Sequence, residues 1–308
     1  MERLRLHHVG HVVRDMSAAL ELYRRLGFVV HAPAYPAMAP REGAAPEPFG
    51  AANTHADFPR DFLELATVVD AGVVPPGARL VPLEAPPEVL PSLLERVNAT
   101  SANLADCLGR FEGLHILMFS SADLDTTAAR LSAGGVRHGG VNTVRRPVGD
   151  DVETVRYLEI DGPEGRIGVA AELEPRIQAS RSEEHPNGAL GLVDATLCAS
   201  DLDAAQARYE LYLGRSARID GAARVFDLDD GVTLTLVPSA DTLFPGEQAS
   251  ALPALVACTV AVRELDVTEK LVRDEGIPLR RTSSGDVFVP ASAALGAAVV
   301  FRQAGSVH

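Results

Sequence analysis

The sequence predicts an α+β fold in which one strand–helix–strands unit occurs four times. The first observation is Leu6–Gly27, where an apolar strand leads through Asp-Met-Ser into apolar residues at helical spacing. The second is that this pattern returns at Gly113–Val136, Leu192–Gly214 and Leu255–Gly276. The third is that alternating or apolar runs, broken by Gly, Pro and Asp, follow each return, as is typical of short strands. We therefore expect four βαβββ modules.

The first strand carries a histidine at a position that faces a cavity. Period-two spacing places one set of residues on the same strand face: Leu4, Leu6, His8, Gly10 and Val12. A histidine in the middle of such a strand points where its apolar neighbours point. We therefore expect His8 to face the space that the sheet encloses.

Two further segments interrupt the repeats in the first half. Residues 31–50 are rich in Pro and Ala, and we expect an irregular loop near a cavity mouth. The region Leu83–Leu108 is apolar at helical spacing after Pro91, which predicts a helix that connects modules one and two.

A polar segment divides the chain into two domains. After Glu174-Pro175 the sequence loses its periodicity and carries Pro-Asn-Gly, which is typical of a turn or linker. We place the N-terminal domain at residues 1–176, the linker at 177–190 and the C-terminal domain at 191–308.

Composition restricts the classes of partner. The chain has 308 residues, 46% of them apolar, which is enough for two domains. Its formal net charge of −14 argues against nucleic acid or an anionic membrane as partner, because either would be repelled. There is no apolar run suited to a signal peptide, and none reaches the roughly 18 residues of a membrane span. We expect a cytoplasmic protein with a small-molecule substrate, and leave a homodimer open.

Two segments of the first module resemble a known superfamily. HHVGHVVRDMSAALELYRRLGF and FLELATVV, at residues 7–28 and 62–69, are similar to the first and last strands of a vicinal oxygen chelate module. That superfamily includes glyoxalase I, methylmalonyl-CoA epimerase, bleomycin-binding proteins and extradiol dioxygenases. The resemblance covers nearly the whole chain and is strongest to the glyoxalase-like branch. It implies that the modules pair into two cupped mixed-sheet domains, with metal ligands on the first and last strands of each module.

The resemblance implies a metal site in the N-terminal domain. The matching positions are His8 and Glu64 in module one, and His115 and Glu172 in module two. Independently of the resemblance, both glutamates lie among apolar neighbours, where an uncompensated carboxylate is costly to bury. Two imidazoles and two carboxylates suit a divalent cation such as Fe, Ni, Zn, Mn or Co. The alternatives are structural histidines and glutamates that face water at a sheet edge.

The C-terminal domain has lost these ligands. Asp194 and Thr235 take the ligand positions in module three, and Ala257 takes the first position in module four. We expect a folded, metal-free pair of modules that serves as scaffold, encloses the active cavity or forms a subunit interface.

Other side chains are candidates for substrate contacts. Asn53 and His55 lie on the strand or loop that precedes Glu64, although a solvated loop is an alternative for them. Arg145 and Arg156 offer planar forks to a carboxylate or phosphate, or else they coat the sheet.

The resemblance favours a metal-dependent glyoxalase-like enzyme, a lyase or isomerase acting on a small carbonyl or enolisable substrate. Glu64 and Glu172 would be the catalytic pair, with a narrow preference for Glu172 as the base that moves the proton. An extradiol-type ring-cleaving dioxygenase is the first alternative. A metal-free protein that binds small molecules such as drugs is the second, and 5% aromatic residues with no Trp weaken it.

Overall fold

The computed structural model describes residues 3–39, 41, 43–69, 74–83, 88–148 and 151–305. In the N-terminal half the elements are β1 (Leu4–Val12), α1 (Met16–Arg25), β2 (Ala34–Met38), β3 (Glu47–Pro48), β4 (Ala51–Asp57), β5 (Phe62–Val68), β6 (Arg79–Pro82), α2 (Leu90–Arg110), β7 (Gly113–Ser121), α3 (Leu124–Ala133), β8 (Asn142–Val148), β9 (Asp151–Gly162), β10 (Gly165–Ala171) and α4 (Pro175–Arg181). In the C-terminal half they are β11 (Ala189–Cys198), α5 (Leu202–Leu213), β12 (Arg218–Asp220), β13 (Ala223–Asp227), β14 (Thr233–Val237), β15 (Ala254–Val262), α6 (Leu265–Asp274), β16 (Arg280–Arg281), β17 (Val287–Val289) and β18 (Ala298–Gln303), with single 3₁₀ turns at Asp229–Gly231, Ala240–Thr242 and Ala291–Ala293.

The four expected βαβββ modules are confirmed. In each module the first strand pairs in parallel with the last: β1 with β5, β7 with β10, β11 with β14 and β15 with β18. The first strands of neighbouring modules pair antiparallel, β1 with β7 and β11 with β15. Each half is therefore a mixed sheet made of two modules, and the fold is α+β.

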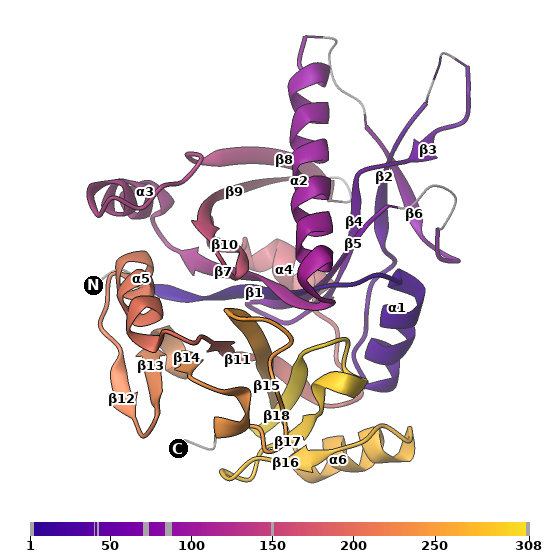
Figure 1. Cartoon of the computed structure of the whole chain (residues 1–308). Helices are drawn as coiled ribbons and strands as arrows, with labels where there is room; N and C mark the ends of the chain where they lie inside the picture. Colours follow the sequence, from indigo (N-terminus) through magenta and orange to yellow (C-terminus); the bar gives the residue numbers. More distant parts are fainter. Residues whose placement is uncertain are drawn as a thin grey trace.

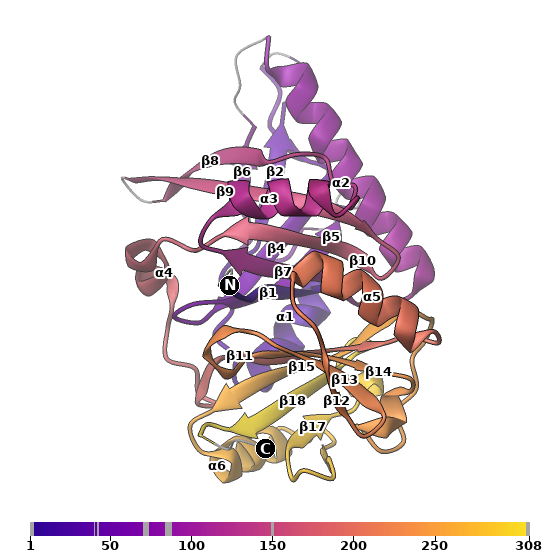
Figure 2. The same cartoon turned by 90° about the vertical axis from the view of Figure 1, so that its left-hand side faces the viewer.

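The largest hydrophobic core lies between the two halves. Val9 and Leu117 of the N-terminal sheet belong to the same buried cluster as Leu197 and Val260 of the C-terminal sheet. One backbone pairing, between β7 and β15, joins the sheets directly. Figure 1 shows the N-terminal half above the C-terminal half, and Figure 2 shows the same arrangement from the side.

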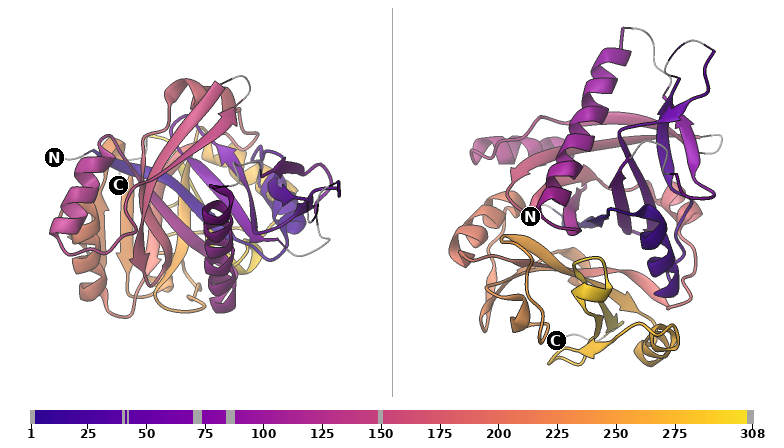
Figure 3. Two further views of the ribbon diagram at one scale, coloured as in Figure 1. Left: turned by 90° about the horizontal axis from the view of Figure 1, so that it is seen from above. Right: turned by 45° about the vertical axis from the view of Figure 1, so that its right-hand side comes forward.

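On the other face of each sheet lies a smaller cluster of buried hydrophobic residues. In the N-terminal half, Ile116 and Met118 pack with Leu104 and Cys107 of α2. That long helix stands against the sheet in Figure 3. In the C-terminal half, Phe244 covers a separate apolar cluster. The faces that could receive a ligand therefore point away from the contact between the halves.

Local sequence accounts for where the module helices begin. Asp15 accepts hydrogen bonds from the backbone of Ser17 at 2.8 Å and of Ala18 at 3.1 Å. Asp123 and Asp201 cap α3 and α5 in the same way. A carboxylate at this position satisfies amide groups that the first helical turn leaves unpaired.

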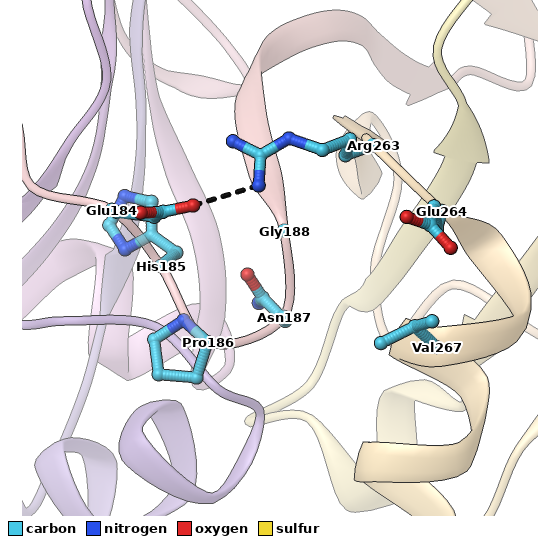
Figure 4. A pocket seen from close by; sticks show the side chains of 8 residues that line it. All are labelled: Glu184, His185, Pro186, Asn187, Gly188, Arg263, Glu264 and Val267. Carbon is cyan, nitrogen blue, oxygen red and sulfur yellow. Dashed lines mark hydrogen bonds and ion pairs between the residues drawn. The ribbon is translucent and has the colours of Figure 1, made fainter.

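The linker docks on both halves. Part of the expected linker, residues 177–190, is helical, because α4 extends to Arg181 under a cap from the carboxylate of Glu174. His185 then accepts a hydrogen bond at Nδ1 from the backbone of Val29 at 2.9 Å. Figure 4 shows the pocket beside this turn, where Arg263 pairs with Glu184 at 2.8 Å.

Two local expectations need correction. Residues 31–50 were expected to form an irregular loop, but they contain the strands β2 and β3. β2 is ordered by pairing in parallel with β6 and antiparallel with β3. On β1, Leu4 and Leu6 join the core between the halves, whereas Val12 joins the cluster under α2. A register shift between Leu6 and His8 reverses the alternation at this point. Among the described residues, none of the helices is long and apolar enough to cross a membrane.

Candidate functional site

The carboxylate of Glu64 is the centre of a polar cluster on the N-terminal sheet. Glu64 lies on β5, and its side chain is only 12% exposed. The amide nitrogen of Asn53, on the neighbouring strand β4, donates to its Oε1 at 2.8 Å. On the other side, Nε2 of His8 lies 3.5 Å from its Oε2. Both carboxylate oxygens thus have a polar neighbour.

Imidazole rings surround this carboxylate. Nε2 of His55 lies 3.9 Å from Oε1 of Glu64, and His55 is directly opposite Glu64 in the strand pairing. The ring of Phe62 is stacked on His8 and tilted against His55, with centroids 4.5 and 4.4 Å apart. Nδ1 of His7 lies 2.7 Å from Nδ1 of His8. The cluster therefore places the nitrogens of three imidazole rings beside one carboxylate.

Arg166 supplies a positive charge to the same sheet face. It lies on β10 opposite Ile116, and it forms an ion pair with Glu159. Burial lowers its pKa, but the carboxylates of Glu159 and, more weakly, Glu64 outweigh burial, so the net pKa is raised. The compensation that Glu64 requires thus comes from Asn53 and from this guanidinium.

His115 lies on the opposite face of the sheet from this cluster. It is fully buried, and its Nε2 lies 2.9 Å from the carbonyl oxygen of Phe111. Burial lowers the pKa of His115. A neutral imidazole held by a backbone carbonyl is a structural arrangement.

Glu172 lies beyond the end of β10. Its side chain is 40% exposed and pairs with Arg5 at 2.7 Å. The register between β7 and β10 explains why Glu172 does not take the position in module two that Glu64 takes in module one. On β1 and β5, Gly10 stands opposite Glu64, and the equivalent pair in module two is Met118 with Gly168. The positions that match His8 and Glu64 in module two are therefore Ile116 and Gly168.

The four expected metal ligands therefore do not meet at one point. Within the described part of the chain, His, Cys, Asp and Glu side chains form no group of three or more that could hold a metal ion. At Glu64, Oε1 accepts an amide N–H from Asn53, which leaves Oε2, beside Nε2 of His8, as the carboxylate oxygen that a cation could use. The donor set around Glu64 does not fit the divalent cation that the resemblance implies.

The remaining predicted contacts divide in two. Asn53 and His55 lie in the cluster, but Asn53 bonds to Glu64 itself. Arg156 lies on β9 and donates to Asp125 at 2.7 Å, beside the start of α3. The side chain of Arg145, on β8, lies outside the described part of the structure.

Sequence reasoning missed Phe62 and Arg166. Phe62 is two residues before Glu64, so the period of a strand places both on one face, and this signal was present in the sequence. Arg166 carried no such signal, because its approach to Glu64 depends on the pairing of β7 with β1.

Comparison with known proteins agrees with this fold. A family model described as a glyoxalase-like domain matches residues 6–213. No curated protein matches the chain significantly. A hypothetical protein from Staphylococcus aureus is similar in structure, with a TM-score of 0.61 and 9% identity, over 97% of this chain and 99% of that one.

Two similar structures have named activities. A triple mutant of 4-hydroxymandelate synthase from Streptomyces coelicolor has a TM-score of 0.63 and 14% identity, over 100% of this chain and 94% of that one. The 2,3-dioxygenase LapB from Pseudomonas sp. KL28 has a TM-score of 0.50 and 13% identity, over 98% of this chain and 92% of that one. At such identities the likeness concerns the fold alone. With its four modules and the match to the family model, the chain belongs to the glyoxalase-like family of the vicinal oxygen chelate superfamily.

Proposed function

We propose that the N-terminal half is an enzyme active site for a small, enolisable carbonyl compound. Glu64 is the general base that removes a proton from the carbon next to the carbonyl, as in an isomerase or lyase. The observation that carries this proposal is the carboxylate of Glu64, nearly buried, with Asn53 at one oxygen and His8 at the other.

The two oxygens of Glu64 have different roles in this mechanism. Oε1 is held by Asn53, which orients the carboxylate. Oε2 takes the proton, and His8, 3.5 Å away, exchanges it with the substrate oxygen or with water. Such contacts contribute to catalysis only if the side chains are held in a fixed geometry. Asn53 and His8 meet this condition, because the strands that carry them, β4 and β1, both pair with β5, which carries Glu64.

The enolate that forms requires a positive or hydrogen-bonding partner. Arg166 is the cationic side chain that interacts electrostatically with Glu64, and its guanidinium is ionised throughout the usual pH range. A fixed positive charge near a developing oxyanion lowers the barrier to proton removal. Of the two glutamates expected as a catalytic pair, for which the resemblance narrowly preferred Glu172 as the base, Glu64 takes that role in this proposal.

The ring-cleaving alternative has less support in the described residues. The four positions that match His8 and Glu64 in the C-terminal half are Asp194, Thr235, Ala257 and Val300. These residues include a single carboxylate and no imidazole, whereas oxygen-activating sites of the two-histidine, one-carboxylate kind require three such ligands.

Proton exchange tests the proposal directly. Hydroxyacetone and dihydroxyacetone in D₂O, followed by proton NMR, report removal of the proton next to the carbonyl. We expect the wild-type protein to accelerate exchange and Glu64→Gln to lower that rate at least about a hundredfold. The matched control Glu172→Gln should retain most of the rate. If neither ketone exchanges faster with wild type than with Glu64→Gln, the proposal fails and a small-molecule binding protein becomes the better assignment.

A further inference from the structure

A cavity of about 430 Å³ opens on the cupped face of the C-terminal sheet. Its volume falls within the range of pockets that hold small organic ligands. It lies on the face of the sheet that points away from the N-terminal half. Its lining includes Asp194, a group of threonines, the apolar residues Val225, Phe244 and Val300, and the guanidinium groups of Arg218 and Arg302.

Asp194 lines this cavity and is almost completely buried, with 4% exposure. Three threonine hydroxyls donate to its carboxylate. Thr235 and Thr233 donate to Oδ1, the former at 2.7 Å, and Thr196 donates to Oδ2 at 2.9 Å. These neutral donors hold the carboxylate in place but bring no positive charge.

The other carboxylates of the lining do have cationic partners. Asp286 pairs with Arg302 at 2.9 Å. Asp220 and Asp227 both pair with Arg218. For Asp194, the described residues provide no Lys, Arg or His within ion-pair distance. The lining thus contains four carboxylates against two guanidinium groups, and Asp194 is the carboxylate without a guanidinium partner among the described residues.

We propose that the cavity binds a small organic amine, with its ammonium group on Asp194 and a compact apolar body against Val225, Phe244 and Val300. A buried carboxylate without a cationic partner is costly, and a ligand cation removes that cost. Because each threonine donates its proton to Asp194, the hydroxyl lone pairs are left to accept from the remaining N–H groups of the ammonium. Phe244 adds an apolar, aromatic side chain to the lining, and an aromatic ring tolerates a nearby cation.

Other ligand classes fit the cavity less well. An anion would meet the carboxylate of Asp194, and the guanidinium of Arg302 is already paired with Asp286. A metal cation would find one carboxylate and neutral hydroxyls, a donor set weaker than those of protein metal sites. The proposal goes beyond the function proposed for the N-terminal half, and neither depends on the other.

Calorimetric titration at about pH 7.5 tests the proposal with three probes of one shape: benzylamine, benzyl alcohol and benzoate. We expect benzylamine to bind wild type, and the neutral and anionic probes to bind at least about tenfold more weakly. Asp194→Asn, which keeps the size and one acceptor oxygen, should weaken benzylamine at least about tenfold. The control Asp203→Asn changes a carboxylate that is 89% exposed on α5 and should leave binding unchanged.

A second variant guards against a folding defect in Asp194→Asn. Thr235→Val keeps the carboxylate and removes one hydroxyl, and we expect it to weaken benzylamine several-fold. The proposal is overturned if wild type does not bind benzylamine, if benzyl alcohol binds as well, or if Asp194→Asn binds the amine with wild-type affinity. Because Glu64→Gln leaves this cavity intact, it should not alter amine binding, which separates this result from the test of the N-terminal site.

Discussion

Asn53 holds Glu64 from the neighbouring antiparallel strand, and the distance from its amide nitrogen to Oε1 of Glu64 is 2.8 Å. The two residues are diagonal neighbours, because the pairing places His55 opposite Glu64 and Asn53 opposite Ala66. A carboxylate fixed from one side presents its other oxygen in a defined direction. Substrate geometry in the proposed reaction therefore depends on a residue that does not itself move a proton.

Asn53→Ala should lower the rate of ketone proton exchange by about tenfold while leaving the fold intact. A hydrogen bond to a charged group contributes about 1.5 to 3 kcal/mol, and its loss leaves the carboxylate free to rotate. Exchange in D₂O by NMR measures the rate, and thermal unfolding checks the fold. Asn103→Ala, an exposed amide on α2, is the control. Unchanged exchange in Asn53→Ala would mean that the orientation of Glu64 does not matter.

Asp61 should make stability depend on pH. It is buried where the first module meets β11, and it accepts a hydrogen bond from the backbone of Leu192 at 2.8 Å. Burial raises its pKa to about 7, well above the usual value for an aspartate. The folded-state pKa lies above the unfolded-state pKa. At pH values between the two, the folded state therefore binds more protons than the unfolded state. Its stabilising contribution is full below about pH 4 and is lost as the pH rises through about 7.

Asp61→Asn removes this dependence, since the amide stays neutral and can still accept from Leu192. The free energy of unfolding of the variant, relative to that of wild type, should rise by on the order of 2 to 4 kcal/mol as the pH goes from about 4 to about 8. Chemical denaturation at both pH values measures the difference. The exposed control Asp106→Asn should show no such change. Parallel pH profiles for Asp61→Asn and wild type would contradict the assignment.

Gly296 should tolerate no side chain, because it lies where the two halves touch. Its φ is +86°, and a Cβ there would come within 1.8 Å of the carbonyl oxygen of Glu112. Gly276 has a similar φ of +72°, but a Cβ would meet nothing within 4 Å. The pair thus separates backbone strain from steric overlap.

Gly276→Ala should cost roughly 1 to 2 kcal/mol, which is the strain of a left-handed backbone. Gly296→Ala should cost about 1 to 3 kcal/mol more, because the contact between the halves must also shift. Urea unfolding of both variants provides the comparison. Equal losses would show that the contact at Glu112 relaxes freely.

Local sequence was sufficient for the repeated architecture. Strand periodicity, a capping Asp and a closing Gly recur in three of the modules, and each signal acts within a few residues of chain. Local reasoning also found His8, and the resemblance supplied Glu64, beside which Asn53 and His55 were expected. It succeeded because β4 and β5 follow one another and pair as neighbours.

The second half of the expected metal site depended on register. His8 precedes its helix cap, Asp15, by seven residues, and Asp194 precedes Asp201 by the same number. In module two the same count reaches Ile116, and His115 is one residue away. Since side chains alternate along a strand, a slip of one residue moves an imidazole to the other face.

What the sequence by itself determined is the order and type of the elements and the cluster around Glu64. Tertiary structure alone decided that Arg166 approaches Glu64 and that Glu172 pairs with Arg5. It also decided that Asp194 lines a cavity and has no cationic partner within ion-pair distance among the described residues. The physical reason is that strand periodicity is a property of neighbouring residues, whereas charge compensation depends on which distant strands pair and in what register.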